Sequence, residues 1–234
     1  MPEVILRNAT IGYKDKAVIS NVNITFKGPG IYLILGRNGS GKTTLLKTIG
    51  GLLRPLGGVV SVVTNGGLVE YVPQERDFNT DFPLTVLEYL WVNYTLRKGL
   101  LPTIRISRYF INEVKKLVLE LGLREEIIDL TLSELSSGES KLVMIAKALI
   151  VNPDVVLLDE PYSSIDHINT PKLTSIINKL GSNRLVIITS HDRIPNLKYL
   201  RGIGLIDNHR LTLLNSKLLS DSTKHKLRVY KVLN

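Results

Sequence analysis

The stretch Gly36-Arg37-Asn38-Gly39-Ser40-Gly41-Lys42-Thr43 decides the fold, because it matches the pattern G-x-x-x-x-G-K-[ST] at every fixed position. The apolar run 31–35 before it predicts a strand buried on both faces, and residues 42–49 after it predict a helix. Glycines in such a turn let successive backbone N–H groups surround a phosphate, where a Cβ atom would collide. The stretch therefore predicts a phosphate-binding loop between a buried strand and a helix.

Residues of this loop have separate expected roles toward a nucleotide. Backbone N–H groups at the helix start would point at the β-phosphate. Lys42 would bridge the β- and γ-phosphates, and the Thr43 hydroxyl would hold Mg²⁺. The nucleotide-binding residues predicted in this stretch are Gly36, Asn38, Gly39, Ser40, Gly41, Lys42, Thr43 and Thr44.

Composition and charge limit the class of protein. The chain has 234 residues, of which 44% are hydrophobic and 22% are charged, so a folded globular protein is expected. There is no cysteine, which excludes a disulfide scaffold, a thiolate metal site and a cysteine nucleophile. No apolar run is long enough to span a bilayer, and the N-terminal residues predict no signal peptide. The net charge of +9 is concentrated partly in a basic tail, residues 215–234.

The chain divides into three stretches by the spacing of its apolar residues. Residues 4–6, 18–26, 59–63 and 68–72 predict strands in the first stretch, with the turn Gly28-Pro29-Gly30 before the buried strand. Apolar residues fall at helical spacing between 75 and 135, which predicts a small helical insertion. Strands are predicted again at 155–158, 185–189 and 203–206, with helices between them. Strands that alternate with helices indicate an α/β sheet.

A pair of carboxylates ends one of the predicted strands. The run Val155-Val156-Leu157-Leu158 is followed directly by Asp159 and Glu160. Ligands of an α/β sheet bind at the carboxyl ends of its strands. We therefore expect Asp159 to face the Mg²⁺ through water. Glu160 is expected near the γ-phosphate as the general base for an attacking water.

Several further motifs stand in a characteristic order. Leu135-Ser136-Ser137-Gly138-Glu139 precedes the acidic pair and is similar to the L-S-G-G-Q signature of ATP-binding cassette (ABC) proteins. The stretch Ser163-Ser164-Ile165-Asp166 resembles the D-loop of that family. Tyr13 occupies the position of its adenine-stacking aromatic residue, Gln74 that of its Q-loop glutamine, and His191 that of its switch histidine. The sequence therefore resembles ABC proteins from residue 13 to 192.

The resemblance implies a fold, a reaction and partners. It implies an α/β fold with a P-loop NTPase (RecA-like) core, a small antiparallel β subdomain and a helical signature subdomain. The core with the β subdomain would comprise 1–74 and 136–214, and the helical subdomain 75–135. It also implies Mg²⁺-dependent ATP hydrolysis, with Glu160, His191, Gln74 and Lys42 as catalytic residues and Thr43, Gln74 and Asp159 as metal ligands. Ser136, Gly138 and Asp166 would contact the nucleotide of a second cassette in a head-to-tail dimer.

Two departures from the family pattern bear on the signature. Ser137 replaces a glycine, so it needs a negative φ or extra space. Glu139 replaces a glutamine and adds a negative charge where a triphosphate is expected. This charge predicts that the signature residues bind the nucleotide of the second cassette more weakly. In addition, Ser140-Lys141 stands where the family often has a Gln-Arg pair after the signature. Between the phosphate loop and the Q-loop, Lys42 and Gln74 are only 32 positions apart, which is short for the family. The short spacing predicts a trimmed β subdomain.

The sequence leaves three functions open. The first is the ATPase subunit of a transporter, cytoplasmic and peripheral at the inner membrane face, which drives separate membrane subunits through a groove in the helical insertion. The second is a soluble ABC ATPase acting on a protein or nucleic-acid assembly, although nucleic acid is not the expected partner. The third is a phosphotransferase or a non-hydrolysing module, which would have no use for the signature motif. The transported substrate, and whether the dimer is homo- or heterodimeric, are not predicted.

Overall fold

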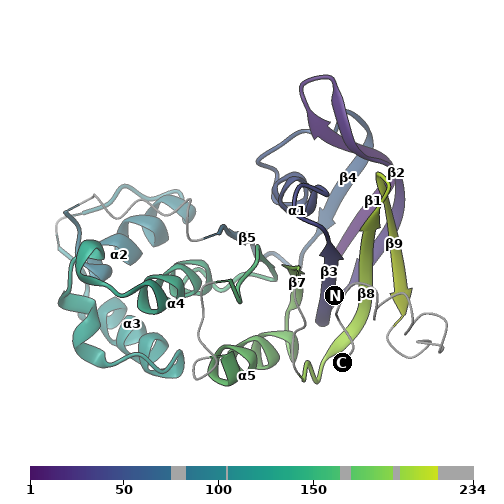
Figure 1. The fold of residues 1–234 in the computed structure, drawn as a ribbon. Coiled ribbons are helices and arrows are strands. Elements are labelled where there is room, and N and C mark those ends of the chain that lie inside the picture. Colours follow the sequence, from purple (N-terminus) through teal and green to yellow (C-terminus); the bar gives the residue numbers. More distant parts are fainter. Residues whose placement is uncertain (75–82, 104, 164–169, 192–195, 216–234) are drawn as a thin grey trace.

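Two β-sheets and a helical lobe make up the molecule, for which we use a computed structural model (Figure 1). The structure describes residues 1–74, 83–103, 105–163, 170–191 and 196–215. Within these ranges no helix is both long enough and apolar enough to cross a bilayer. The predicted basic tail from residue 216 onward lies outside the described residues.

The larger sheet has six strands in the order β5-β6-β7-β3-β8-β9. The first five are parallel, and β9 pairs antiparallel with β8 at the edge. Their bounds are β5 Val69–Val72, β6 Val155–Leu158, β7 Leu185–Ser190, β3 Gly30–Gly36, β8 Leu200–Asp207 and β9 Arg210–Asn215. Every residue of β3, β6 and β7 is buried, as expected for central strands with both faces covered. These findings confirm the predicted α/β class.

The smaller sheet is antiparallel, with the order β2-β1-β4. Its strands are β1 Glu3–Tyr13, β2 Lys16–Lys27 and β4 Gly57–Val63. A hydrophobic cluster fills the space between the two sheets and includes Phe26, Ile34 and Leu46. This packing brings the end of β1 close to the phosphate loop that follows β3.

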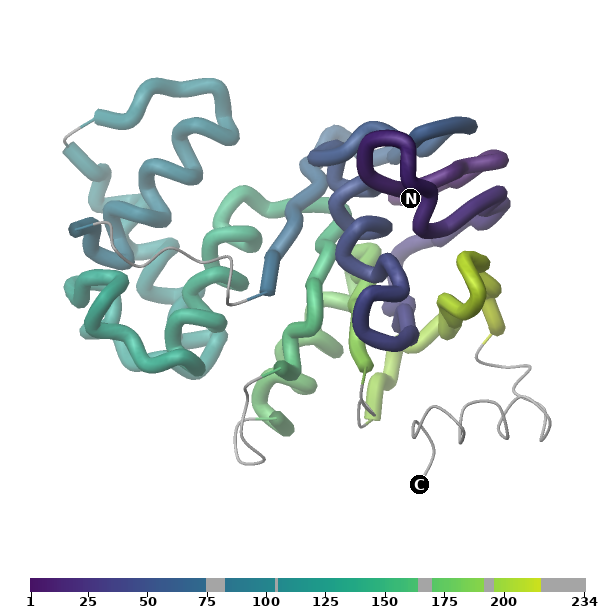
Figure 2. The backbone as a smooth tube through the Cα atoms, turned by 45° about the horizontal axis from the view of Figure 1, so that its top comes forward, coloured from purple at the N-terminus to yellow at the C-terminus, as the bar shows by residue number. Residues whose placement is uncertain are grey.

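A lobe of helices lies to one side of the sheets, on the left in Figures 1 and 2. It contains α2 Val86–Arg97, α3 Arg108–Glu120, the two 3₁₀ segments Glu125–Asp129 and Leu132–Glu134, and α4 Ser137–Leu149. Two further helices, α1 Lys42–Ile49 and α5 Thr170–Gly181, pack on the larger sheet. The sequence predicts one apolar helix face that is formed by Phe110, Val114, Leu117, Val118 and Leu121. These side chains are buried, except Leu117, which is half-buried. α4 contacts α2, α3 and β5, and so it joins the lobe to the sheet.

Four details differ from the sequence-based expectations. β1 runs to Tyr13, well beyond residue 6, because antiparallel partners on both sides extend it. β9 was not predicted, and its three leucines are only half-buried at the sheet edge. A helix is predicted over residues 140–150, but α4 begins three residues earlier, at Ser137, because a serine–glutamate capping box starts it. Between β7 and β8 no helix is present among the described residues of the connection.

Candidate active site

The predicted phosphate loop connects the buried end of β3 to the first turn of α1. Gly41 caps the helix with φ of 105°, a left-handed conformation that side-chain-bearing residues rarely adopt. A Cβ atom on Gly36 would lie 2.4 Å from Ser40 Oγ and 3.1 Å from the carbonyl oxygen of Ile206, so the turn leaves little space for a side chain. Gly36 and Gly41 therefore have steric or backbone reasons within the chain itself, and the predicted close approach of a phosphate stays a prediction.

Ser40 gives the loop a polar atom suited to an external ligand. Among the described residues, Ser40 Oγ is the one buried side-chain nitrogen or oxygen without a hydrogen-bond partner. Buried hydroxyl groups in proteins nearly always have a partner. A phosphate oxygen in the loop would supply one, which fits the predicted nucleotide.

Lys42 is buried beneath the loop, with 5% of its side chain exposed. Its Nζ donates hydrogen bonds to the carbonyl oxygens of Gly36 (2.9 Å) and Arg37 (3.2 Å). The same Nζ lies 3.2 Å from Glu160 Oε1 in an ion pair. The ammonium group is thus fixed between the loop and the carboxylate of Glu160, which the sequence predicts to be the general base.

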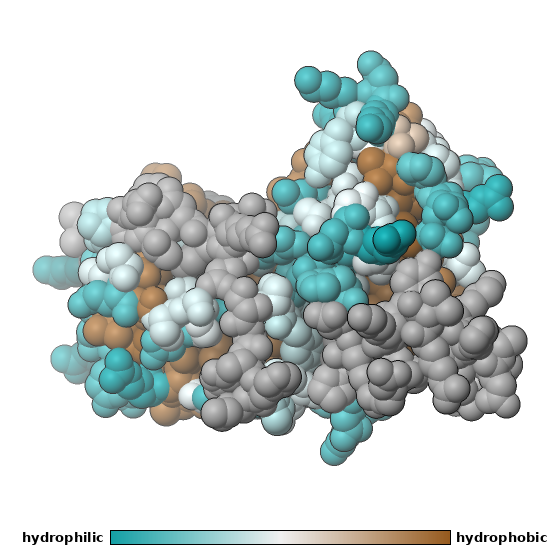
Figure 3. Space-filling model, in the orientation of Figure 1, coloured by the Kyte–Doolittle hydropathy of each residue, from teal (hydrophilic) through white to brown (hydrophobic). Residues whose placement is uncertain are grey.

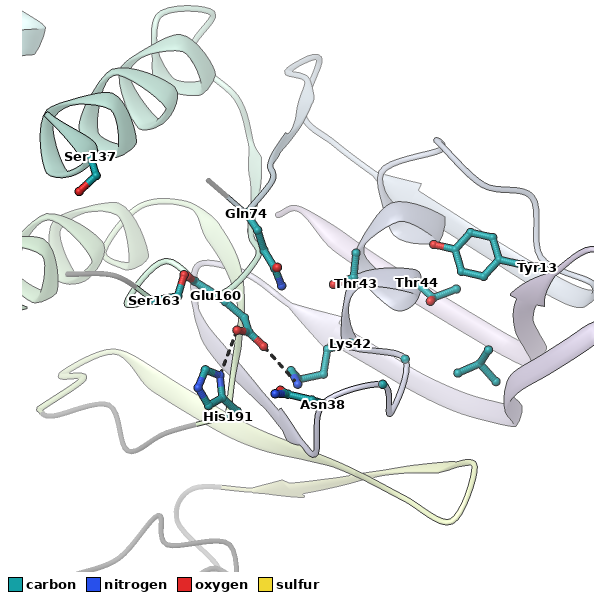
Figure 4. A pocket seen from close by; sticks show the side chains of 13 residues that line it. Tyr13, Asn38, Lys42, Thr43, Thr44, Gln74, Ser137, Glu160, Ser163 and His191 are labelled. Atoms are coloured by element: carbon teal, nitrogen blue, oxygen red, sulfur yellow. Dashed lines mark hydrogen bonds and ion pairs between the residues drawn. The ribbon is translucent and has the colours of Figure 1, made fainter. Parts of the chain in front are cut away.

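The carboxylate of Glu160 lies between a cation and an imidazole (Figure 4). One oxygen faces Lys42, and the other lies 3.0 Å from Nδ1 of His191. Glu160 follows β6 and His191 follows β7, the neighbouring parallel strand. Because the carboxyl ends of parallel strands meet at one edge, residues 31 positions apart face each other here.

Asp159 is almost fully buried, and two hydroxyl groups hold its carboxylate. Thr189 Oγ1 donates to Oδ1 at 2.6 Å, and the Tyr71 hydroxyl donates to Oδ2 at 3.1 Å. Thr189 Oγ1 also accepts a hydrogen bond from the backbone N–H of Glu160 at 2.9 Å. Sequence reasoning gave neither Thr189 nor Tyr71 a role. The one available signal was a hydroxyl residue within the apolar run of β7.

These residues surround one pocket of about 1010 Å³. Of the predicted site residues, those that line it are Tyr13, Asn38, Gly39, Gly41, Lys42, Thr43, Thr44, Gln74, Glu160 and His191. Val18, Ser137 and Ser163 line it as well and were missed. Gly36, Ser40 and Asp159 are predicted site residues that do not line it. Asp166 lies outside the described residues.

Tyr13 and Ser137 mark opposite sides of this pocket (Figure 4). Tyr13 ends β1 with 46% of its surface exposed, so its ring is open to a ligand. Ser137 is the first residue of α4, across the pocket from the phosphate loop. The helical conformation there does not require glycine, which answers the question raised by the Gly-to-Ser departure. Ser136 and Gly138 do not line the pocket.

The start of α4 carries a closed capping box. Ser136 donates to Glu139 Oε2 from both its hydroxyl (2.7 Å) and its backbone N–H (3.0 Å). These hydrogen bonds lower the pKa of Glu139, so its carboxylate is charged at neutral pH. Of the donors that the resemblance assigns to a partner's phosphate, the Ser136 hydroxyl is therefore hydrogen-bonded to a carboxylate of the same chain.

Comparisons with known proteins identify the family of this chain. The ABC transporter family model matches residues 19–163. The zinc import ATP-binding protein ZnuC of Ehrlichia chaffeensis (strain ATCC CRL-10679 / Arkansas) is 36% identical over 189 residues, covering 80% of this chain and 73% of that protein.

Two solved structures share the fold. MJ1267, an ATP-binding cassette of an ABC transporter in its ADP conformation, has a TM-score of 0.78 at 23% identity and covers 98% of this chain and 99% of that one. The dimeric cassette MJ0796 bound to ADP and Pi has a TM-score of 0.75 at 24% identity, covering 91% and 98%. The family match excludes the phosphotransferase alternative and favours the transporter over the soluble ABC ATPase. This chain belongs to the ABC transporter family and is an ATP-hydrolysing subunit of such a transporter.

Proposed function

We propose that this chain binds ATP in the pocket between the phosphate loop and Glu160 and hydrolyses it to drive separate membrane subunits. The observation that carries the proposal is the convergence of Lys42, Glu160 and His191 in one pocket. Lys42 would hold the β- and γ-phosphates, with the loop N–H groups around them. The ring of Tyr13 would stack on the base, for which its exposure and its place in the pocket are the support.

Glu160 would act as the general base on a water beside the γ-phosphate. A base must lie within hydrogen-bond reach of the proton it removes, and this carboxylate faces the pocket. His191 hydrogen-bonds Glu160 Oε2, so it would orient the carboxylate and hold a proton at Nδ1. Gln74, at the end of the segment after β5, would help to position the water.

The residues proposed as Mg²⁺ ligands have suitable chemistry. Mg²⁺ prefers oxygen ligands, and Thr43, Gln74 and Asp159 offer a hydroxyl, an amide oxygen and a carboxylate. Bound Mg²⁺ would neutralise charge on the phosphates during transfer. Asp159 does not line the pocket and its carboxylate is held by Thr189 and Tyr71, so we propose that it acts through water.

A second cassette would complete the site in a head-to-tail dimer. Ser136 and Ser137 are exposed at the start of α4, where a partner's nucleotide could reach them. Helix N-termini with serine hydroxyls are suited to binding anions. We propose that Ser136 and Gly138 contact the γ-phosphate bound by the partner, and that Asp166 contributes to the same interface.

The helical lobe offers a surface for the membrane subunits. Figure 3 shows hydrophobic side chains exposed among hydrophilic ones over this lobe. A cavity of about 570 Å³ lies there, lined by aromatic residues that include Trp91, Tyr94 and Tyr109. We propose that a membrane subunit docks at this cavity and so places the chain at the inner face of the cell membrane. Zinc is the first cargo to test, because a curated relative is named for zinc import.

The Glu139→Gln variant is expected to dimerise at lower ATP concentration than wild type. Gln keeps an acceptor for Ser136, but it removes the negative charge next to the proposed γ-phosphate position. We expect the ATP concentration for half-maximal dimer to fall about two- to fivefold, which corresponds to ~0.4–1 kcal/mol for an exposed charge. Analytical ultracentrifugation across an ATP series measures it.

Glu134→Gln is the matched control for that variant. Thr131 and Glu134 form the same kind of capping box, with two hydrogen bonds of 2.7 Å and a lowered Glu134 pKa, but Glu134 does not bond to Ser136. Because both carboxyl pKa values are lowered in the folded protein, each cap stabilises at neutral pH, and that stability is lost as pH falls through the lowered pKa. An equal shift in both variants would refute a specific effect at the signature.

The proposed function is tested by affinity purification from native cells. Tagged Glu160→Gln protein is recovered with ATP after detergent solubilisation, and its partners are identified by mass spectrometry. A stoichiometric partner with several membrane spans is the expected result. Recovery of soluble proteins alone, or of ribosomal or nucleic-acid material, would contradict the proposal, and the Lys42→Ala protein serves as the control without a trapped dimer.

A further inference from the structure

A lysine is buried in the middle of the site without lining the nucleotide pocket. Lys141, on α4, is 2% exposed and is among the largest fully buried side chains of the described residues. Its Nζ donates to three oxygens of one turn: the carbonyl of Glu160 (3.1 Å), the carbonyl of Ser163 (2.7 Å) and Ser163 Oγ (3.0 Å). Burying an ammonium group is costly unless it is hydrogen-bonded, so the position needs an explanation.

The turn that Lys141 contacts holds Glu160 in an unusual backbone conformation. Glu160 has φ of +46°, in the left-handed region that residues other than glycine seldom occupy. Such a conformation persists only where surrounding contacts enforce it, and it is frequent at functional sites. Here the direction of the carboxylate depends on that backbone conformation.

Contacts fix the peptide groups on both sides of the Glu160 Cα atom. Its N–H donates to Thr189 Oγ1 at 2.9 Å. Its carbonyl oxygen accepts from Lys141 Nζ, from Ser163 Oγ at 2.8 Å and from the Ser163 N–H at 3.0 Å. Of these donors, only Lys141 comes from the helix whose first turn carries the signature residues.

We infer that Lys141 is a positioning residue for ATP hydrolysis, which ties the signature helix α4 to the turn that directs Glu160 into the pocket. The inference rests on the proposed role of Glu160 as the general base. Lys141 does not line the nucleotide pocket, so it acts on the reacting atoms through Glu160. Loss of its hydrogen bonds therefore changes the turnover rate and leaves ATP affinity unchanged.

Lys141→Met tests this role, because methionine fills similar space and donates no hydrogen bond. We expect kcat to fall at least about tenfold with KM for ATP within about threefold, since a small misplacement of a catalytic group is costly. Lys141→Gln keeps an N–H donor and is expected to recover part of kcat. Lys147→Met is the control: Lys147 lies on the same helix and is partly buried, and burial lowers its pKa, but its neighbours are Glu70 and Arg97. That control is expected to keep wild-type kcat.

A second measurement separates positioning from a purely structural role. The Glu160→Gln/Lys141→Met double variant is expected to form the ATP-bound dimer as the Glu160→Gln single variant does, because Lys141 acts only through the base. Loss of that dimer, or wild-type kcat in Lys141→Met, would overturn the inference. Thermal unfolding of each variant is recorded, and if Lys141→Met does not fold, Lys141→Gln carries the same comparison. Absence of ATP hydrolysis in the wild-type protein would instead contradict the proposed function, and this inference with it.

Discussion

Replacing Glu160 with glutamine is expected to abolish ATP turnover while ATP binding persists. Glutamine has nearly the same shape, so the contacts to Lys42 and His191 can be retained, but it cannot accept the proton of the attacking water. General-base catalysis contributes about 10²- to 10⁴-fold, and we expect kcat to fall within that range. Because the γ-phosphate is then not released, the ATP-bound dimer should accumulate. Phosphate release and size-exclusion chromatography with ATP measure the two effects.

The Glu134→Gln protein controls for the loss of a glutamate away from the pocket. It is expected to hydrolyse ATP at the wild-type rate and to form no long-lived dimer. If Glu160→Gln hydrolyses ATP like wild type, Glu160 is not the general base. If it loses ATP binding as well, the carboxylate is needed to hold the site together, and the assignment of a separate catalytic role fails.

The elements around the phosphate loop were predictable because their signals are local. An apolar run followed by the glycine-rich motif favours a buried strand that leads into a helix. α1 has the predicted bounds, and β3 is one residue longer at each end than predicted. The acidic pair at the end of β6 was predictable for the same reason. The edge strand β9 was not, because an edge strand buries little and its pattern is weak.

The partners that hold the site residues could not be read from the sequence. Thr189 meets Asp159 across a gap of 30 residues, and Tyr71 meets it across 88. Lys141, on α4, contacts the turn that follows β6 and contains Glu160. Such contacts depend on strand order and register, which only the folded chain fixes. The sequence identified the residue types suited to the reaction. The packing of the folded chain determined that Thr189, Tyr71 and Lys141 are the residues that orient them.

Replacing Lys42 with alanine is expected to weaken ATP binding strongly. Its ammonium group is the buried cation at the loop, and a hydrogen bond to a charged group contributes about 1.5–3 kcal/mol. The variant should therefore bind ATP at least about tenfold more weakly, measured by isothermal titration calorimetry. Two loop carbonyls and the Glu160 carboxylate would also lose a donor or an ion-pair partner. We therefore expect a lower unfolding temperature as well.

Lys47→Ala separates these effects from a general loss of a lysine. Lys47 lies on the same helix, five residues further along, and does not line the pocket. Its variant should bind ATP with wild-type affinity. Unchanged affinity in Lys42→Ala would contradict the phosphate-loop assignment, because no other buried cation lines the pocket among the residues that the structure describes. Reduced affinity with unchanged unfolding temperature would mean that Lys42 serves the nucleotide and that the loop holds its shape without it.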